Sequence, residues 1–214
     1  MSARGRPIDN MKFILGTKGK MTTVFTEEGR AYAATVIFVA PATITQIKTR
    51  EKDGYSAVQI GALETKESRV NKAQLGHAKG KALKHFRENR LKDEKTPQEV
   101  GSVVDVSVFT PGDTVAVSAI SKGKGFQGVV KRHGFHGGPR THGQKHSERE
   151  AGSIGGGGRA GGRVAKGMRM AGRMGGDRVT VKNLTVLQVH RETNELLLAG
   201  AVPGRRGTLV EIRG

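Results

Sequence analysis

The chain has 214 residues, enough for one or two domains, and carries a formal net charge of +18. This charge favours a nucleic acid or another anionic surface as the partner. The absence of cysteine excludes disulfides and thiolate metal sites and fits an intracellular protein, and no apolar run approaches the roughly 20 residues of a membrane span. Tryptophan is absent and aromatic residues are few, which argues against an extended base-stacking platform. Residues 1–10 lack the apolar segment of a signal peptide and are interpreted as a basic N-terminal tail.

Residues 11–61 are predicted to form strands that make up the first part of a β-barrel. Residues 35–40 make a continuous apolar run, typical of a buried strand, that ends at Pro41. Residues 43–50 alternate β-branched and polar side chains, as a half-buried strand does. Asp53-Gly54 predicts a tight hairpin turn into the next strand, and Glu28-Gly29 marks an earlier turn.

Residues 62–100 differ in composition and are predicted to form a small α-rich insert with a basic surface. Lys, Ala, Leu and Glu dominate there, and β-branched residues become rare. Residues 81–89 predict a short helix with Leu83 and Phe86 on one face. Gly76 and Gly80 keep any helix in this insert short.

Strand signals return in residues 101–121 and again in residues 178–214. Pro111-Gly112 predicts a type II turn between two strands of the first segment. Residues 178–190 predict one long strand with room for a bulge, and two shorter strands complete the chain. Eight or so short strands joined by tight turns favour a mainly β fold with a closed barrel.

Residues 122–177, called the extension below, cannot build a hydrophobic core. Residues 121–178 contain 18 of the 32 glycines, 13 Lys or Arg and only three acids. Such a segment cannot offset its own ordering entropy, about 1–2 kcal/mol per residue for the backbone alone. Because strands flank it on both sides, we expect this cationic loop to become ordered on a polyanion.

Two motifs in the extension invite other interpretations. Residues 123–128 fit G-x-G-x-x-G after a strand, but a dinucleotide site also needs a helix, and glycines follow residues 129–133 almost at once. A flexible basic turn is the better interpretation. The histidines crowd together without a thiol or a nearby acid, so contacts with nucleic acid are favoured over a metal site; they are His133, His136, His142 and His146. Ser147 and Ser153 lie in no nucleophile elbow.

The same residues closely resemble a known family. Residues 123–135 (GKGFQGVVKRHGF) resemble the signature of ribosomal protein three of the large subunit, in its universal bacterial form. The resemblance continues through Thr141-His142-Gly143, residues 152–155, residues 166–172 and residues 196–204. It covers nearly the whole chain from about residue 11.

The resemblance implies a translation-protein-type β-barrel with a long extension into rRNA. Proteins of this family bind near the 3′ end of 23S rRNA, help to start assembly of the large subunit, and send the extension towards the peptidyl transferase centre. That centre is RNA, so the resemblance implies no catalytic residue, no cofactor and no small-molecule substrate. It also implies a cytoplasmic ribosomal location and large-subunit proteins fourteen and nineteen as neighbours, with no membrane partner. Residues implied near the centre are Gly137, Gly138, Thr141, His142 and Gly143.

The chain departs from the family pattern at two positions. Some relatives carry a methylated Gln where this chain has Gly138, so that modification is expected to be absent. The usual glycine before the N-terminal Met-Thr is Lys20.

The candidate rRNA-binding residues are cations and histidines of the extension. Arginine can bind phosphate oxygens bidentately, and glycine lets backbone N–H groups approach phosphates. The candidates are Lys122, Lys124, Lys131, Arg132, His133, His136, Arg140, His142, Lys145, Arg163, Lys166, Arg169 and Arg173. Lysines outside the extension, such as Lys48 and Lys66, are interpreted as solvated. An enzyme and an unspecific nucleic-acid chaperone remain the alternatives; bound metal or activity would favour the first, and equal affinity for unrelated RNAs the second.

Overall fold

A computed structural model describes residues 12–91, 99–155 and 161–214 of the chain. The chain divides into two units. The first comprises the chain up to Ile120 together with Arg178–Gly214, and the second is Ser121–Asp177. The predicted N-terminal tail and part of the glycine run at 155–163 lie outside the described residues.

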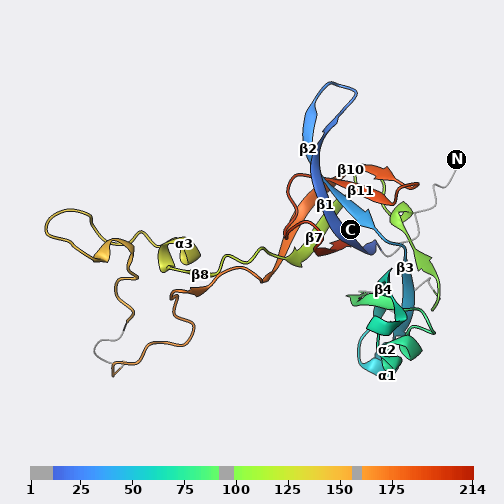
Figure 1. The fold of residues 1–214 in the computed structure, drawn as a ribbon, viewed down its shortest axis with the longest axis horizontal. Helices are drawn as coiled ribbons and strands as arrows, with labels where there is room; N and C mark the ends of the chain where they lie inside the picture. The colour runs from blue at the N-terminus through green and yellow to red at the C-terminus, as the bar shows by residue number, and fades with distance from the viewer. Residues whose placement is uncertain (1–11, 92–98, 156–160) are drawn as a thin grey trace, which may run out of the picture. The chain divides into compact units, whose positions relative to one another are not determined.

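A closed six-stranded antiparallel barrel forms the centre of the first unit (Figure 1), as predicted, but it has fewer strands than the eight or so expected, because two of the strands predicted within residues 43–61 pair in a separate sheet. Its strands follow one another around the barrel in the order β1-β12-β7-β10-β11-β2. Their bounds are β1 Phe13–Phe25, β2 Ala31–Val39, β7 Thr114–Ile120, β10 Arg178–His190, β11 Glu195–Ala199 and β12 Leu209–Arg213. Because side chains alternate along each strand, every second residue points inward, and the interior is filled by Ile14, Ile37, Val117, Leu196 and Ile212.

Several predicted turns and irregularities are confirmed in the barrel unit. Gly29 has a φ of 77° in the turn between β1 and β2. Gly112 has a φ of 92°, and the Asp113 N–H donates to the Thr110 carbonyl at 3.1 Å, as a type II turn requires. The long strand β10 is bulged, because its register against β7 shifts between Val181 and Leu184.

A second, four-stranded antiparallel sheet packs on the outer face of β1. Its order is β5-β4-β3-β6, with bounds β3 Ala42–Lys48, β4 Ala57–Glu64, β5 Leu83–Arg90 and β6 Val103–Val104. Phe13 and Leu15 point away from the barrel interior and are fully buried against Ile44, Val58 and Ile60 of this sheet. The barrel wall is therefore apolar on both faces at this point.

The hairpin predicted at Asp53-Gly54 is present, but its connection is longer than a tight turn. Strands β3 and β4 pair antiparallel, with Lys48 opposite Ala57. Between them runs the one-turn helix α1 Arg50–Asp53, which ends at Gly54 with a φ of 79°. The glycine therefore terminates a helix, since this left-handed conformation suits it best.

The predicted helix at residues 81–89 is wrong, because this segment forms strand β5. Phe86 pairs with Gly61 of β4, and Leu83 is buried at the end of the same strand pair. Pairing along β4 satisfies the backbone hydrogen-bonding groups and buries Leu83, which outweighs the small intrinsic preference of Lys, Ala and Leu for a helix.

The helical part of the insert is α2 Lys72–His77, which Asn71 caps by accepting a hydrogen bond from the Gln74 N–H at 2.8 Å. In the described part of the chain, the short 3-10 turns are η1 Glu67–Arg69, η2 Val106–Val108 and η3 Ser147–Arg149. Among the described residues, no helix is long and apolar enough to cross a membrane.

The second unit is held together by backbone hydrogen bonds between its outgoing and returning segments. Strand β8 Phe126–Gln127 pairs with β9 Gly172–Arg173. Nearby, the Lys124 N–H donates to the Met174 carbonyl at 2.9 Å. Of the described residues in this unit, Val129, at the start of α3 Val129–His133, is the one that is buried. The expectation of a segment without a hydrophobic core is thus met in the described residues.

Candidate nucleic-acid interface

The paired segments at the base of the second unit carry three of the predicted cations. Lys122 and Lys124 lie on the outgoing segment, and Arg173 lies on the returning strand β9; all three are exposed. The backbone approaches closely here, since a Cβ at Gly175 would lie 2.2 Å from the Lys122 carbonyl oxygen. Gly175 therefore keeps the two segments close enough to present these cations together.

Helix α3 presents three predicted residues in its last turn, and two of them also brace the unit. Arg132 Nη1 donates to the Met170 carbonyl at 2.8 Å, and His133 Nε2 lies 3.0 Å from the same oxygen. Lys131 is exposed and makes no such contact with the residues that the structure describes. Lys131 is thus free to meet a phosphate, whereas Arg132 and His133 are partly committed to internal contacts.

Residues 137–148 form a loop that is closed by its own backbone. The Gly138 N–H donates to the Ser147 carbonyl at 3.0 Å. A Cβ at Gly137 would lie 1.9 Å from the Glu148 carbonyl oxygen, and one at Gly138 would lie 2.7 Å from that of Ser147. Both glycines are therefore required by a close approach within the chain itself.

Charges in this loop are arranged differently from the sequence expectation. Arg140 Nε lies 2.7 Å from Glu148 Oε1, in an exposed ion pair. This is the one ion pair among the described residues of the second unit, and its acid partially neutralises a predicted phosphate ligand. Thr141, His142, Gly143 and Lys145 are exposed around the loop.

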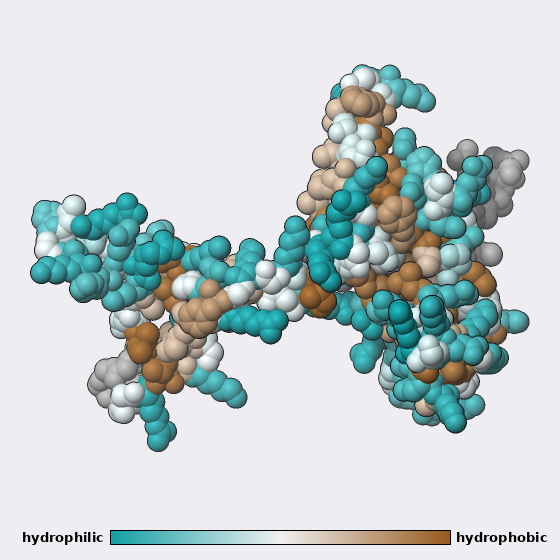
Figure 2. Space-filling model, viewed as in Figure 1, coloured by the Kyte–Doolittle hydropathy of each residue, from teal (hydrophilic) through white to brown (hydrophobic). Residues whose placement is uncertain are grey.

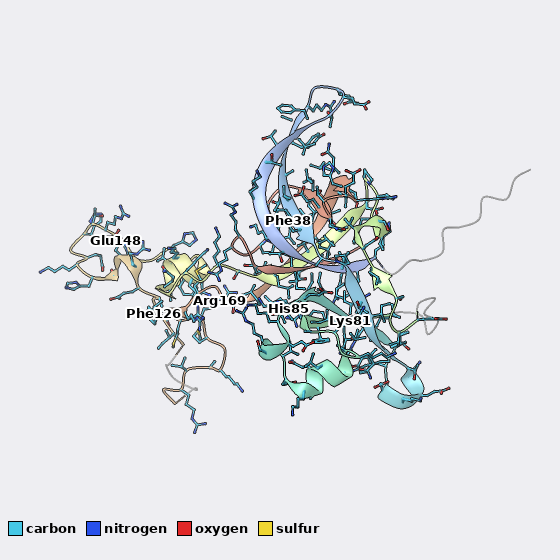
Figure 3. All side chains as sticks on the ribbon, turned by 45° about the vertical axis from the view of Figure 1, so that its right-hand side comes forward. Phe38, Lys81, His85, Phe126, Glu148 and Arg169 are labelled. Carbon is cyan, nitrogen blue, oxygen red and sulfur yellow. The ribbon has the colours of Figure 1, made fainter. Side chains whose placement is uncertain are left out.

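The remaining predicted cations lie on the returning segment. Arg163, Lys166 and Arg169 are exposed, and no acid of the described residues pairs with them. Figure 3 shows the side chains of this unit, with Arg169 and Glu148 labelled. A polyanion could therefore contact these side chains without displacing an internal partner.

A concave pocket of about 550 Å³ opens in the second unit. It is lined by His133, Phe135, His136, Glu150 and Arg169, together with glycines and other residues of the neighbouring loop. The rings of His133 and Phe135 have centroids 6.0 Å apart and planes tilted by 45°. Sequence reasoning missed this pocket and the participation of Phe135 and Glu150, because residues from three separate segments form it.

The clustered histidines do not assemble a metal site in the described part of the chain. His133 and His136 line the pocket, whereas His142 and His146 are not among its lining residues. No group of three or more His, Asp or Glu side chains in residues 12–91, 99–155 and 161–214 is placed to hold a metal ion. The arrangement offers hydrogen-bonding and stacking groups.

Lys48, which the sequence suggested was simply solvated, belongs to a polar network on the four-stranded sheet. Its Nζ lies 2.8 Å from the Tyr55 hydroxyl and 3.0 Å from Glu88 Oε1, and the Tyr55 hydroxyl donates to Glu88 at 2.9 Å. Hydrogen bonds with Tyr55 and Glu88 raise the pKa of Lys48, and the ammonium of Lys48 lowers the pKa of Glu88. The network fixes the sheet surface and leaves Lys48 little freedom to bind elsewhere.

The β1–β2 hairpin exposes apolar side chains beside acids. Phe25 is 70% exposed and Tyr32 is 40% exposed, and Glu27 and Glu28 occupy the turn between their strands. Figure 2 shows apolar surface along this hairpin next to its hydrophilic tip. Arg30 Nε lies 3.5 Å from Glu28 Oε2, so the turn with Glu27 carries little net charge and lacks the excess of cations found in the second unit.

Comparisons with known proteins agree on one family. A family model described as ribosomal protein L3 matches residues 93–202. The large ribosomal subunit protein uL3 of Herpetosiphon aurantiacus is 49% identical over 201 residues, which cover 93% of this chain and 94% of that protein. The protein of the same description from Carboxydothermus hydrogenoformans is 48% identical over 205 residues, covering 94% of this chain and 96% of that protein. The protein of this description from Acidothermus cellulolyticus is 48% identical over 205 residues, which cover 95% of this chain and 92% of that protein.

Proposed function

Because the chain belongs to the ribosomal protein L3 family, we propose that it is a primary rRNA-binding protein. Membership of this family makes the chain a structural constituent of the large subunit of the cytoplasmic ribosome and not an enzyme. In this proposal it binds near the 3′ end of 23S rRNA and nucleates assembly of the subunit. The observation that carries the proposal is the second unit, which is strongly cationic and has a single buried residue among those described. Such a segment gains its stabilising contacts from a polyanion.

The proposed contacts follow from the chemistry of the exposed groups. Arg163, Lys166, Arg169 and Arg173 have no internal acid partner in the described chain, so their charges are available to phosphates. Guanidinium groups bind phosphate oxygens bidentately, while lysines act as point charges. Arg140 is expected to contribute less, because Glu148 already lies beside it. The barrel unit then acts as the rigid base of these contacts.

The closed loop at residues 137–148 is proposed to lie towards the peptidyl transferase centre. The proposal rests on the family resemblance of Gly137, Gly138, Thr141, His142 and Gly143. The backbone closure through Gly138 and Ser147 supports it, because a loop shaped before binding loses less entropy when it meets RNA. Chemistry at that centre belongs to RNA, so the role of the loop is to support nucleotides.

Neighbouring ribosomal proteins are proposed to contact the β1–β2 hairpin. Its exposed Phe25 and Tyr32 offer apolar area, and the Glu28–Arg30 ion pair together with Glu27 leaves the turn weakly acidic, which suits a basic protein surface better than a phosphate. Family analogy suggests large-subunit proteins fourteen and nineteen as the neighbours. A photo-crosslinker at Phe25 in intact large subunits would test this assignment, since a crosslink to rRNA would contradict it.

Direct binding tests the central part of the proposal. The purified full chain is titrated against a 3′-domain fragment of 23S rRNA, against a 5′-domain fragment of equal length, and against an unrelated RNA at the same salt concentration. We expect clearly tighter binding to the 3′-domain fragment. Equal affinity for all three RNAs would contradict the proposal and favour an unspecific nucleic-acid chaperone.

A further inference from the structure

The pocket beside α3 has the composition of a site for a flat, polar ring. His133, Phe135 and His136 supply ring faces and edges, and Glu150 and Arg169 supply charges of opposite sign. Its volume of about 550 Å³ lies within the ~300–1,000 Å³ range of small-ligand pockets. Low aromatic content predicts no extended stacking platform, but a single pocket needs only one or two rings.

The presence of Glu150 in the pocket needs a physical explanation, because a carboxylate repels the phosphate backbone of RNA. The second unit contains three acids, Glu148, Glu150 and Asp177. Glu148 forms its ion pair with Arg140. Glu150 has no ion-pair partner among the described residues, and it lines the pocket with Arg169 without reaching ion-pair distance from it. A carboxylate in this position has its acceptor oxygens available to a ligand that donates hydrogen bonds.

Resting on the proposed rRNA binding, we propose that this pocket receives one unpaired guanine base of the rRNA. Sequence-specific recognition of RNA uses unstacked bases that lie against aromatic or imidazole rings and are hydrogen-bonded along their edges. Guanine is the base whose Watson–Crick edge presents two adjacent donors, N1–H and the N2 amino group, which match the two oxygens of Glu150. Phe135 stacks on the base, and Arg169 neutralises the phosphate of the same nucleotide.

Chemical probing of assembled large subunits tests the inference. Kethoxal modifies the Watson–Crick edge of unpaired guanines, so a guanine held by Glu150 is protected in the parent. We expect the same single guanine to become reactive, approaching its reactivity in protein-free rRNA, in subunits carrying Phe135→Ala and in subunits carrying Glu150→Gln. Glu148→Gln is the matched control, because it removes the same charge two residues away, from a side chain that does not line the pocket.

The contradicting results are equally specific. Suppose that Phe135→Ala and Glu150→Gln are each incorporated at full occupancy. If no single guanine then gains kethoxal reactivity in both variants, the pocket holds no guanine. If Glu148→Gln exposes the same guanine, the effect reports opening of the loop and the inference also fails. Occupancy is measured separately in each subunit preparation, so that failure of rRNA binding is distinguished from failure of the pocket assignment.

A second measurement serves if Phe135→Ala prevents assembly. A photoreactive phenylalanine azide replaces Phe135, which keeps its ring. Irradiation of the subunits should give a crosslink to one unpaired guanine, mapped by a stop in reverse transcription. A crosslink to paired nucleotides or to protein would overturn the inference.

Discussion

Arg87 Nε donates to Glu211 Oε1 at 2.9 Å, which joins strand β5 of the four-stranded sheet to strand β12 of the barrel. The Glu211 side chain is 8% exposed, and Arg178 of β10 donates to its other carboxylate oxygen. A nearly buried carboxylate thus receives a charge-assisted hydrogen bond on each oxygen. The contact also explains why a basic residue stands in the middle of β5.

Removing this carboxylate should destabilise the barrel unit. We expect Glu211→Gln to lower the free energy of unfolding by about 1.5–3 kcal/mol, the usual worth of hydrogen bonds to charged groups. Glu64→Gln, at the exposed end of β4, is the matched control and should change little. Denaturant unfolding of the purified chain measures both. Equal stability of the two variants would show that the contact contributes nothing.

Acid should weaken the network around Glu88. Its pKa is lowered by Lys48, Tyr55 and Gln59, so the stabilisation is complete above the unfolded-state pKa of about 4.3 and is lost as pH falls through the folded value. The difference in unfolding free energy between the parent and Glu88→Gln should therefore shrink as pH is lowered from 7 to about 3. A difference that stays constant over this range would contradict the assignment.

The closed loop should depend on Gly137 and tolerate change at Gly143. Ala at position 137 would place its Cβ 1.9 Å from the Glu148 carbonyl oxygen, so the loop must open. Gly143 has a φ of 79° but no neighbour within 4 Å among the described residues, so Ala there costs only local strain of about 1–2 kcal/mol. Hydrogen exchange of the Gly138 amide, which donates to Ser147, should accelerate in Gly137→Ala well beyond Gly143→Ala. Similar exchange in both variants would argue against the closure.

The salt dependence of rRNA affinity should distinguish the cations without an acid partner in the described chain from Arg140, which is paired with Glu148. Arg163→Ala should flatten the slope of log K against log salt by about 0.7–0.9, the contribution of one neutralised phosphate. Arg140→Ala should flatten it less, because Glu148 lies 2.7 Å away and already offsets that charge. The combined replacement of Arg163, Lys166, Arg169 and Arg173 by Ala should reduce the slope by several units. Slopes that do not move would place these side chains away from phosphates.

Gly138→Arg should act on peptide-bond formation through the loop. The Arg side chain would bring bulk and charge towards nearby RNA. It would also clash with the Ser147 carbonyl oxygen, which lies 2.7 Å from a Cβ at position 138. Large subunits with this variant at full occupancy should show slower peptidyl transfer or altered footprints of drugs that bind at the centre. If neither measurement changes, the loop does not reach the centre in this protein.

Local patterns were sufficient for the barrel but not for the insert. Alternating and continuous apolar runs predicted β2 and β10, and Gly29 and Gly112 marked turns that require a positive φ. Residues 83–89 were misassigned to a helix because their helix-forming composition says nothing about the partner strand β4 or about Glu211. Pairing between residues distant in sequence decided the conformation there.

The candidate interface shows the same limit. Scarcity of apolar residues and acids in the extension predicted an exposed cationic surface, which the described residues present. The close approach of Gly137 to Glu148, the Arg140–Glu148 pair and the pocket at Phe135 depend on how the loop folds back on itself. No spacing rule in the sequence encodes such contacts.

Retention of the full chain on large subunits after a high-salt wash tests the central claim most directly. Many phosphate contacts along the second unit, together with a specific rRNA site, should keep the protein bound at one copy per subunit. The quadruple variant of Arg163, Lys166, Arg169 and Arg173 should be released at lower salt than the parent. Release of the parent under conditions that leave the other large-subunit proteins bound would contradict the account.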